Sequence, residues 1–185
     1  CEAVPEKKAV NIVRIIPEKI DEKKPYIVLC AGGGYRCVCS MVEAYPVAAQ
    51  MVQRGYQVFV LTYRVNKTPV LPAALQDLAA ALRYIDDSAE KFHIKPENYI
   101  LGGFSAGANL VGNWGTTSAG YHQFGINSPK AMILIYAPVI SGTPVEGNAD
   151  IFMMQMYGKD FKVGEVKKYF IDQKLDSDYP PCYIV

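Results

Sequence analysis

The chain contains only two histidines, His93 and His122, and it has neither long apolar runs nor runs of like charge. No stretch approaches the ~20 consecutive apolar residues that a membrane-spanning helix needs. Its 19 Lys and Arg residues are scattered and nearly balance its 18 Asp and Glu residues, so it lacks the basic stripe of nucleic-acid-binding proteins and the acidic run of a charged tail. We therefore expect a soluble globular protein with no nucleic-acid partner and no membrane span.

Cysteine usage gives no sign of a metal site. Cys30 and Cys182 stand in apolar, strand-like runs, where a reduced core thiol is expected. Cys37 and Cys39 form a C-x-C pair, which lacks zinc spacing and has no second cluster to complete it. We predict no metal, a reducing compartment and hence a cytoplasmic location.

The length and composition fit one domain over residues 1–185. Half of the residues are hydrophobic, which is enough for a sizeable core in a chain of this size. The chain begins at Cys1 rather than Met and shows no signal peptide, so we expect its amino end to be trimmed or processed.

Predicted strands and helices alternate along the chain. The expected strands are residues 10–16, 26–30, 58–62, 99–101, 131–136 and 181–185, and the expected helices are residues 40–54, 72–92, 108–116, 151–158 and 165–173. Ser40 and Glu43 are predicted to form a capping box at the first helix. Apolar strands that alternate with helices predict an α/β fold, with a mostly parallel, doubly wound sheet and helices on both faces.

The sequence Gly103-Phe104-Ser105-Ala106-Gly107 lies between a predicted strand and a predicted helix. The pattern G-x-S-x-G alone occurs by chance in roughly one chain in fifteen of this length. Between a strand and a helix it predicts a nucleophile elbow, in which the serine oxygen stands clear of the backbone. The flanking glycines are expected because side chains there would collide with the neighbouring strand and helix. Ser105 is the candidate catalytic nucleophile.

Three consecutive glycines follow the predicted strand 26–30 and reach the same edge of the sheet. Such a loop frees backbone N–H groups to approach a ligand closely. The N–H groups of Gly33, Gly34 and Ala106 are the candidate oxyanion hole, which would stabilise the negative charge of a tetrahedral intermediate. A phosphate cradle or a merely flexible loop is the alternative, but the Lys-Ser/Thr or G-x-G-x-x-G pattern of a phosphate loop is missing.

Three segments resemble the α/β-hydrolase fold, in the order Cys30-Ala-Gly-Gly-Gly-Tyr35, Leu61-Thr-Tyr-Arg64 and Gly102-Gly-Phe-Ser-Ala-Gly-Ala-Asn-Leu110. Within it they are similar to the acetyl-esterase and carboxylesterase group, which includes hormone-sensitive-lipase-like and carbohydrate-esterase-like enzymes. The resemblance implies a serine esterase with a Ser-His-Asp/Glu triad and no cofactor. Ala31 stands where many relatives carry His or Pro, and Ala108 stands where glycine is usual.

The triad acid and histidine of this fold follow the serine in chain order, after the last strands. Both His93 and His122 precede predicted strands, so we expect them at the opposite edge of the sheet from Ser105, at least ~15 Å away. The layout of the family implies that the acid and histidine lie beyond residue 185, that the chain is truncated at its carboxyl end, and that it is inactive alone.

The leading hypothesis is a serine hydrolase that cleaves short-chain carboxylic esters, including O-acetyl groups of sugars, through an acyl-enzyme at Ser105. Tyr35 and Arg36, beside the glycine loop, are candidate substrate contacts. The alternatives are a non-catalytic ligand-binding module and a peptidase of the same fold. A final strand that ends at Val185 would leave an apolar sheet edge that favours pairing with a second copy.

Overall fold

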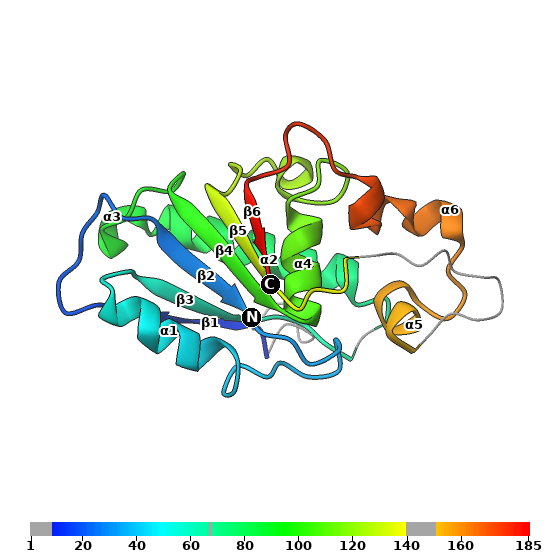
Figure 1. The fold of residues 1–185 in the computed structure, drawn as a ribbon, viewed down its shortest axis with the longest axis horizontal. Helices are drawn as coiled ribbons and strands as arrows, with labels where there is room; N and C mark the ends of the chain where they lie inside the picture. Colours follow the sequence, from blue (N-terminus) through cyan, green and yellow to red (C-terminus); the bar gives the residue numbers. More distant parts are fainter. Residues whose placement is uncertain (1–8, 67, 140–150) are drawn as a thin grey trace.

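A computed structural model describes residues 9–66, 68–139 and 151–185 (Figure 1). The strands are β1 (Asn11–Ile15), β2 (Tyr26–Cys30), β3 (Val58–Thr62), β4 (Tyr99–Phe104), β5 (Ala131–Ile135) and β6 (Cys182–Ile184). The α-helices are α1 (Ala44–Gln53), α2 (Leu71–Asp87), α3 (Ala89–Phe92), α4 (Ala106–Trp114), α5 (Ile151–Tyr157) and α6 (Val163–Val166). The 3₁₀ helices are η2 (Tyr121–Phe124), η3 (Lys167–Tyr169) and η4 (Ile171–Gln173).

The six described strands form one sheet in the order β1-β3-β2-β4-β5-β6. Only β1 is antiparallel to its neighbour, so the predicted mostly parallel sheet is confirmed. In β2 and β4, Cys30 lies opposite Gly103. The glycine loop that follows β2 and the serine that follows β4 therefore leave the same edge of the sheet as neighbours.

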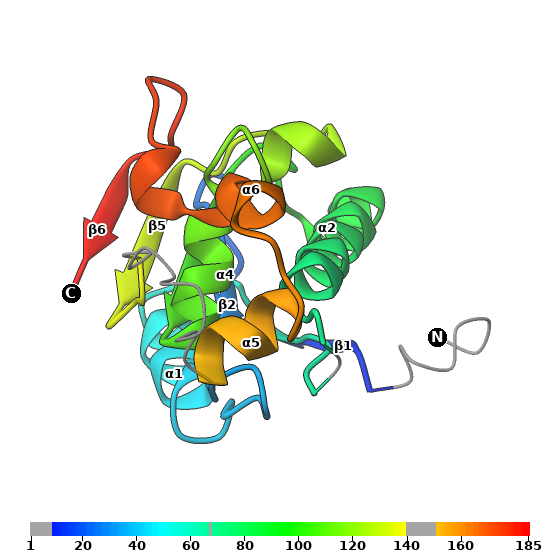
Figure 2. The ribbon, with the colours of Figure 1, turned by 90° about the vertical axis from the view of Figure 1, so that its right-hand side faces the viewer.

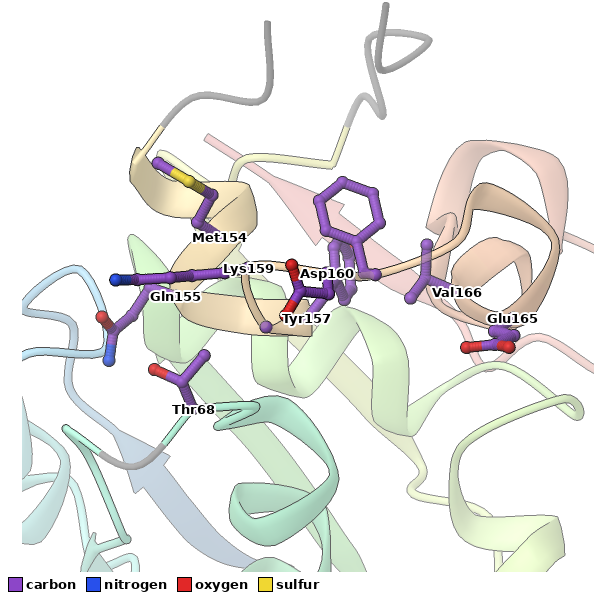
Figure 3. A pocket seen from close by; sticks show the side chains of 10 residues that line it. Thr68, Met154, Gln155, Tyr157, Lys159, Asp160, Glu165 and Val166 are labelled. Atoms are coloured by element: carbon purple, nitrogen blue, oxygen red, sulfur yellow. The ribbon is translucent and has the colours of Figure 1, made fainter. Parts of the chain in front are cut away.

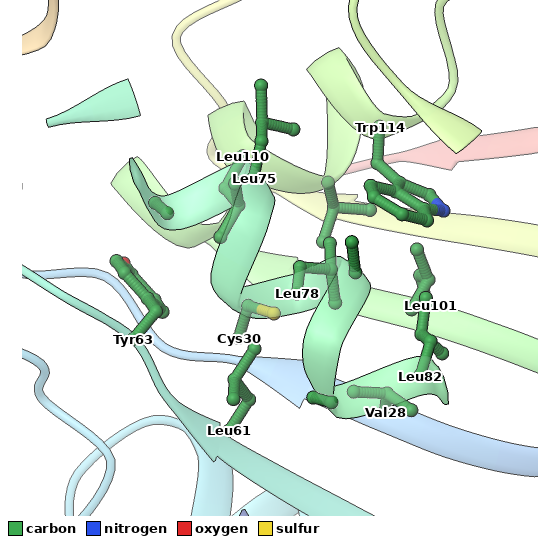
Figure 4. Close-up of a cluster of buried hydrophobic side chains, with 14 of the residues drawn as sticks. Val28, Cys30, Leu61, Tyr63, Leu75, Leu78, Leu82, Leu101, Leu110 and Trp114 are labelled. Carbon is green, nitrogen blue, oxygen red and sulfur yellow. The ribbon is translucent and has the colours of Figure 1, made fainter. Parts of the chain in front are cut away.

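Helices cover both faces of the sheet, as the alternation predicts (Figures 1 and 2). Successive side chains of a strand point to opposite faces. In β2, Val28 and Cys30 join the large core beneath α2 and α4, whereas Ile27 and Leu29 join the smaller core beneath α1. Figure 4 shows part of the large core, in which Cys30 packs among leucines of α2. Every residue of β2 is buried, which explains its uninterrupted apolar sequence.

The predicted capping box is wrong. Helix α1 begins at Ala44, and Glu43 occupies its N-cap position without a side-chain capping bond. The Glu43 carboxylate instead accepts hydrogen bonds from the Gly32 N–H and the Tyr136 hydroxyl. The Ser40 hydroxyl is buried without a partner among the described residues. Local backbone bonds, from the N–H groups of Val42 and Glu43 to the carbonyl of Cys39, form the turn before α1 in place of side-chain caps.

Two other expectations about helices are corrected. The expected helix at residues 72–92 is divided at Ser88, whose N–H is shared between the carbonyls of Tyr84 and Ile85. Residues 165–173 form the end of α6 and two 3₁₀ helices rather than one α-helix.

Strand β6 lies at the edge of the described sheet and pairs with β5 alone. As a result Cys182 is exposed, and the expectation of a core thiol there is wrong, whereas Cys30 is buried as predicted. In the part of the chain that the structure describes, no helix combines the length and the apolar character required to cross a membrane.

Candidate active site

Ser105 occupies a sharp turn between β4 and α4. Its φ of 49° and ψ of −118° lie outside the regions that residues with a side chain normally adopt. The Ser105 N–H donates to the carbonyl of Ile135 in β5 (3.0 Å), and its carbonyl accepts from the N–H of Asn109 in α4 (2.9 Å). Strained backbone held from both sides in this way is typical of functional positions.

The glycines on either side of Ser105 are required by close packing. A Cβ atom on Gly103 would lie 2.4 Å from the carbonyl oxygen of Gly107, inside α4. A Cβ atom on Gly107 would lie 2.0 Å from the carbonyl oxygen of Cys30, at the end of β2. The expectation that side chains there would collide with strand and helix is confirmed.

The glycine loop lies directly against this turn. A Cβ atom on Gly32 would be 2.8 Å from Cβ of Ser105. Gly33 and Gly34 have φ values of 124° and 60°, which glycine adopts at little cost. The N–H groups of Gly33, Gly34 and Ala106 donate to no acceptor within the described ranges. Three free backbone donors thus belong to the loop and the helix start that flank Ser105.

Glu43 reaches this loop from the segment before α1. Its Oε2 accepts a hydrogen bond of 2.5 Å from the N–H of Gly32, and its Oε1 accepts one of 3.1 Å from the hydroxyl of Tyr136, just after β5. Loss of hydration, followed by the bond to Glu43, raises the pKa of the Tyr136 phenol. Nothing in the sequence marks Glu43 as a site residue, because its spacing from Ser40 is that of a helix cap.

Tyr35 supports the loop from beneath. Its side chain is fully buried, and its hydroxyl donates to Oδ1 of Asn109 in α4 (3.0 Å). Asn109 in turn donates to the carbonyl of Pro138 (2.8 Å). A buried ring offers no surface to a substrate, so the expectation that Tyr35 contacts the substrate does not fit the structure. Arg36 is exposed beside the loop and stays a predicted contact.

A second buried network holds the base of the loop. The Tyr63 hydroxyl donates to the carbonyl of Ala31 (2.6 Å). Next to it, Arg64 forms an ion pair of 2.9 Å with Asp77 of α2, whose side chain is inaccessible to solvent. Asp77 is thus engaged in a structural pair. The segment Leu61-Thr-Tyr-Arg64 that resembles hydrolases therefore stabilises the end of β3 and the start of the glycine loop.

Comparisons with known proteins show the family and the fold of this chain. A family model described as BD-FAE matches residues 14–173. The chain belongs to the BD-FAE family. Its structure is similar to the crystal structure of an acetyl ester-xyloside bifunctional hydrolase from Caldicellulosiruptor lactoaceticus, with a TM-score of 0.76 and 27% sequence identity. The match covers 94% of this chain and 64% of the hydrolase chain. The fold is that of the α/β-hydrolases.

Two curated relatives extend the comparison. The BD-FAE chain is 33% identical over 116 residues to an acetylxylan esterase from Xylanibacter ruminicola, and 25% identical over 176 residues to endo-1,4-beta-xylanase B from Butyrivibrio fibrisolvens. The matches cover 62% and 89% of this chain, respectively. They span only 22% of the esterase and 27% of the xylanase.

The two histidines of the BD-FAE chain lie away from Ser105. His93 follows α3 and bonds through Nδ1 to Glu22, a residue that precedes β2 (3.0 Å). His122 lies in η2, which precedes β5. Both therefore lie at the amino edge of the parallel strands, whereas Ser105 follows β4, whose six residues rise about 3.3 Å each. This placement agrees with the expectation that both histidines lie at the opposite edge of the sheet from Ser105.

A cavity of about 600 Å³ opens beside α5 (Figure 3). Its lining residues are Thr68, residues 154, 155 and 157–161, Glu165 and Val166. It includes neither Ser105 nor the glycine loop. Gln155 links the two regions, because its side chain donates to the carbonyl of Tyr35 (3.4 Å) while it lines the cavity.

Proposed function

We propose that this chain supplies the nucleophile and the oxyanion hole of a serine hydrolase that cleaves short-chain carboxylic esters. The observation that carries the proposal is the strained turn at Ser105, flanked by the N–H groups of Gly33, Gly34 and Ala106, which have no acceptor among the described residues. Acyl transfer needs both parts, since the nucleophile creates an oxyanion that backbone donors then stabilise.

In the proposed reaction, Oγ of Ser105 bonds to the carbonyl carbon of the ester, and a histidine accepts the proton of the hydroxyl. The carbonyl oxygen becomes an oxyanion among the three N–H groups. The bond to the alcohol oxygen then breaks, and the alcohol leaves with the proton from the histidine. Water attacks the acyl-enzyme in the same way, releasing the acid and restoring Ser105.

The triad acid and histidine are proposed to come from chain beyond Val185. Both histidines present are at the other edge of the sheet, and the chain covers only part of each relative. Without a base the Ser105 hydroxyl keeps its proton at neutral pH, so residues 1–185 alone are expected to be inactive.

The names of two relatives favour an O-acetyl group on a sugar as the ester. One is an acetylxylan esterase, and another is an acetyl ester-xyloside bifunctional hydrolase. We therefore propose that the full-length protein deacetylates sugars. Arg36, exposed beside the glycine loop, is the proposed contact for the alcohol portion.

The test is to treat the full-length protein with a fluorophosphonate probe and with p-nitrophenyl acetate. We expect label on Ser105 and turnover in the wild type, and neither in Ser105→Ala. Absence of both label and turnover in the intact protein would contradict the proposal and favour a binding module. Turnover of peptides but not of acetyl esters would favour a peptidase.

A further inference from the structure

The carboxylate of Glu43 connects three segments that meet at the candidate oxyanion hole. It accepts hydrogen bonds from Gly32, at the start of the glycine loop, and from Tyr136, after β5. A Cβ atom on Gly32 would lie 3.2 Å from Oε2 of Glu43 and 2.8 Å from Cβ of Ser105. The carboxylate and the proposed nucleophile therefore flank the same glycine.

The segment from Cys39 to Glu43 binds both the backbone N–H and the backbone carbonyl of Gly32. Its N–H donates to Glu43, and its carbonyl accepts from the N–H of Cys39 (3.0 Å). The carbonyl of Cys39 accepts from the N–H of Glu43 in turn (3.2 Å), which closes a hydrogen-bonded ring. This ring of hydrogen bonds fixes the backbone of Gly32, the residue that directly precedes Gly33 and Gly34.

We infer that Glu43 is a positioning residue, which holds the glycine loop so that the N–H groups of Gly33 and Gly34 face the oxyanion. This inference rests on the proposed function. Glycine with positive φ has many accessible conformations, and an oxyanion hole loses its effect when its donors are not held in place. A hydrogen bond from an N–H to a carboxylate is stronger than one between neutral groups, so Glu43 is well suited to that task.

The alternative role, a cap for α1, does not fit the contacts. The side chain makes no capping bond at the N-terminus of α1, and the Ser40 hydroxyl, the other half of a capping box, has no partner among the described residues. Ser40 therefore provides a matched control on the same turn.

The experiment compares Glu43→Ala, Glu43→Gln and Ser40→Ala in the full-length protein with p-nitrophenyl acetate. In Glu43→Ala we expect kcat to fall about 10- to 100-fold with KM within about twofold of wild type, because misplaced donors weaken transition-state binding more than substrate binding. Glu43→Gln keeps an oxygen for the Gly32 N–H and should restore kcat to within about threefold. Ser40→Ala should behave as wild type.

Three kinetic results would overturn the inference: an unchanged kcat in Glu43→Ala, a Glu43→Gln variant as impaired as Glu43→Ala, or an equal loss in Ser40→Ala. Hydrogen exchange of the Gly32 amide gives a readout that does not need activity. It should be slow in wild type and Glu43→Gln and about tenfold faster or more in Glu43→Ala. Equal exchange rates in all variants would refute the positioning role.

If the wild type neither turns over esters nor accepts the probe on Ser105, the proposed function fails. The exchange rates then show separately whether Glu43 holds the loop.

Discussion

At the scale of single residues, the backbone of Ser105 and its two glycine neighbours follow from the sequence pattern. The pattern G-x-S-x-G predicts a tight turn, and the φ of 49° at Ser105 with the close contacts of Gly103 and Gly107 agrees with it. The G-x-S-x-G pattern does not predict which side chains are buried beneath the glycine loop. Tyr35 is buried, and its hydroxyl donates to Asn109 of α4, a partner 74 residues away.

We predict that Gly107→Ala destabilises the protein by about 2 kcal/mol or more and abolishes labelling of Ser105 by the fluorophosphonate probe. The new methyl group would meet the carbonyl oxygen of Cys30 at 2.0 Å, so β2 and α4 must move apart. Urea unfolding measures the loss of stability. Gly164→Ala is the control, because no atom of the described residues lies within 4 Å of a Cβ at that position, and its stability should stay within about 0.5 kcal/mol.

At the scale of elements, hydrophobic periodicity identifies the strands and the long helices, but it does not determine where the helices begin. Helix α1 starts at Ala44, and the Glu43 carboxylate accepts from the Gly32 N–H and the Tyr136 hydroxyl instead of capping the helix. A spacing of Ser and Glu shows that a capping box is possible, and long-range partners decide whether it forms.

A buried ion pair joins the end of β3 to α2, and we predict that Asp77→Asn lowers the free energy of unfolding by about 3–5 kcal/mol. The change leaves the Arg64 guanidinium, which is 9% exposed, without its charged partner. Chemical denaturation measures the effect. Glu22→Gln is the control, because the Glu22–His93 pair is more than 60% exposed at both side chains and should contribute less than about 0.5 kcal/mol. If Asp77→Asn and Glu22→Gln lowered the free energy of unfolding equally, the Arg64–Asp77 ion pair would not be the stabilising contact that we predict.

At the scale of the whole molecule, the parallel sheet creates the candidate site by placing segments far apart in sequence at one edge. The glycine loop follows β2, Ser105 follows β4 and Tyr136 follows β5, and these three strands are neighbours. The same topology places His93 and His122 at the other edge.

The large core also predicts how stability depends on pH. Burial raises the pKa of Cys30 from 9.0 to about 12, and it raises the pKa values of Tyr35 and Tyr63 well above 10.0. The unfolded chain loses these protons first, so the free energy of unfolding should fall as the pH rises from about 9 to 12.

We expect a loss of about 2 kcal/mol or more between pH 8 and pH 10.5, measured by urea unfolding under reducing conditions. Cys30→Ala should show a smaller fall over the same range, because one of the titrating groups is removed. A stability that is flat or rises over this range would contradict the burial of these groups.

The sequence by itself determined the α/β architecture, the turn at Ser105 and the glycine loop beside it, because these depend on local periodicity and on backbone conformations that glycine permits. Only the tertiary structure decided that Tyr35 is buried, that Glu43 binds the loop and that Cys182 is exposed. The physical reason is that burial and hydrogen-bond partners are set by segments that the sheet brings together from distant parts of the chain.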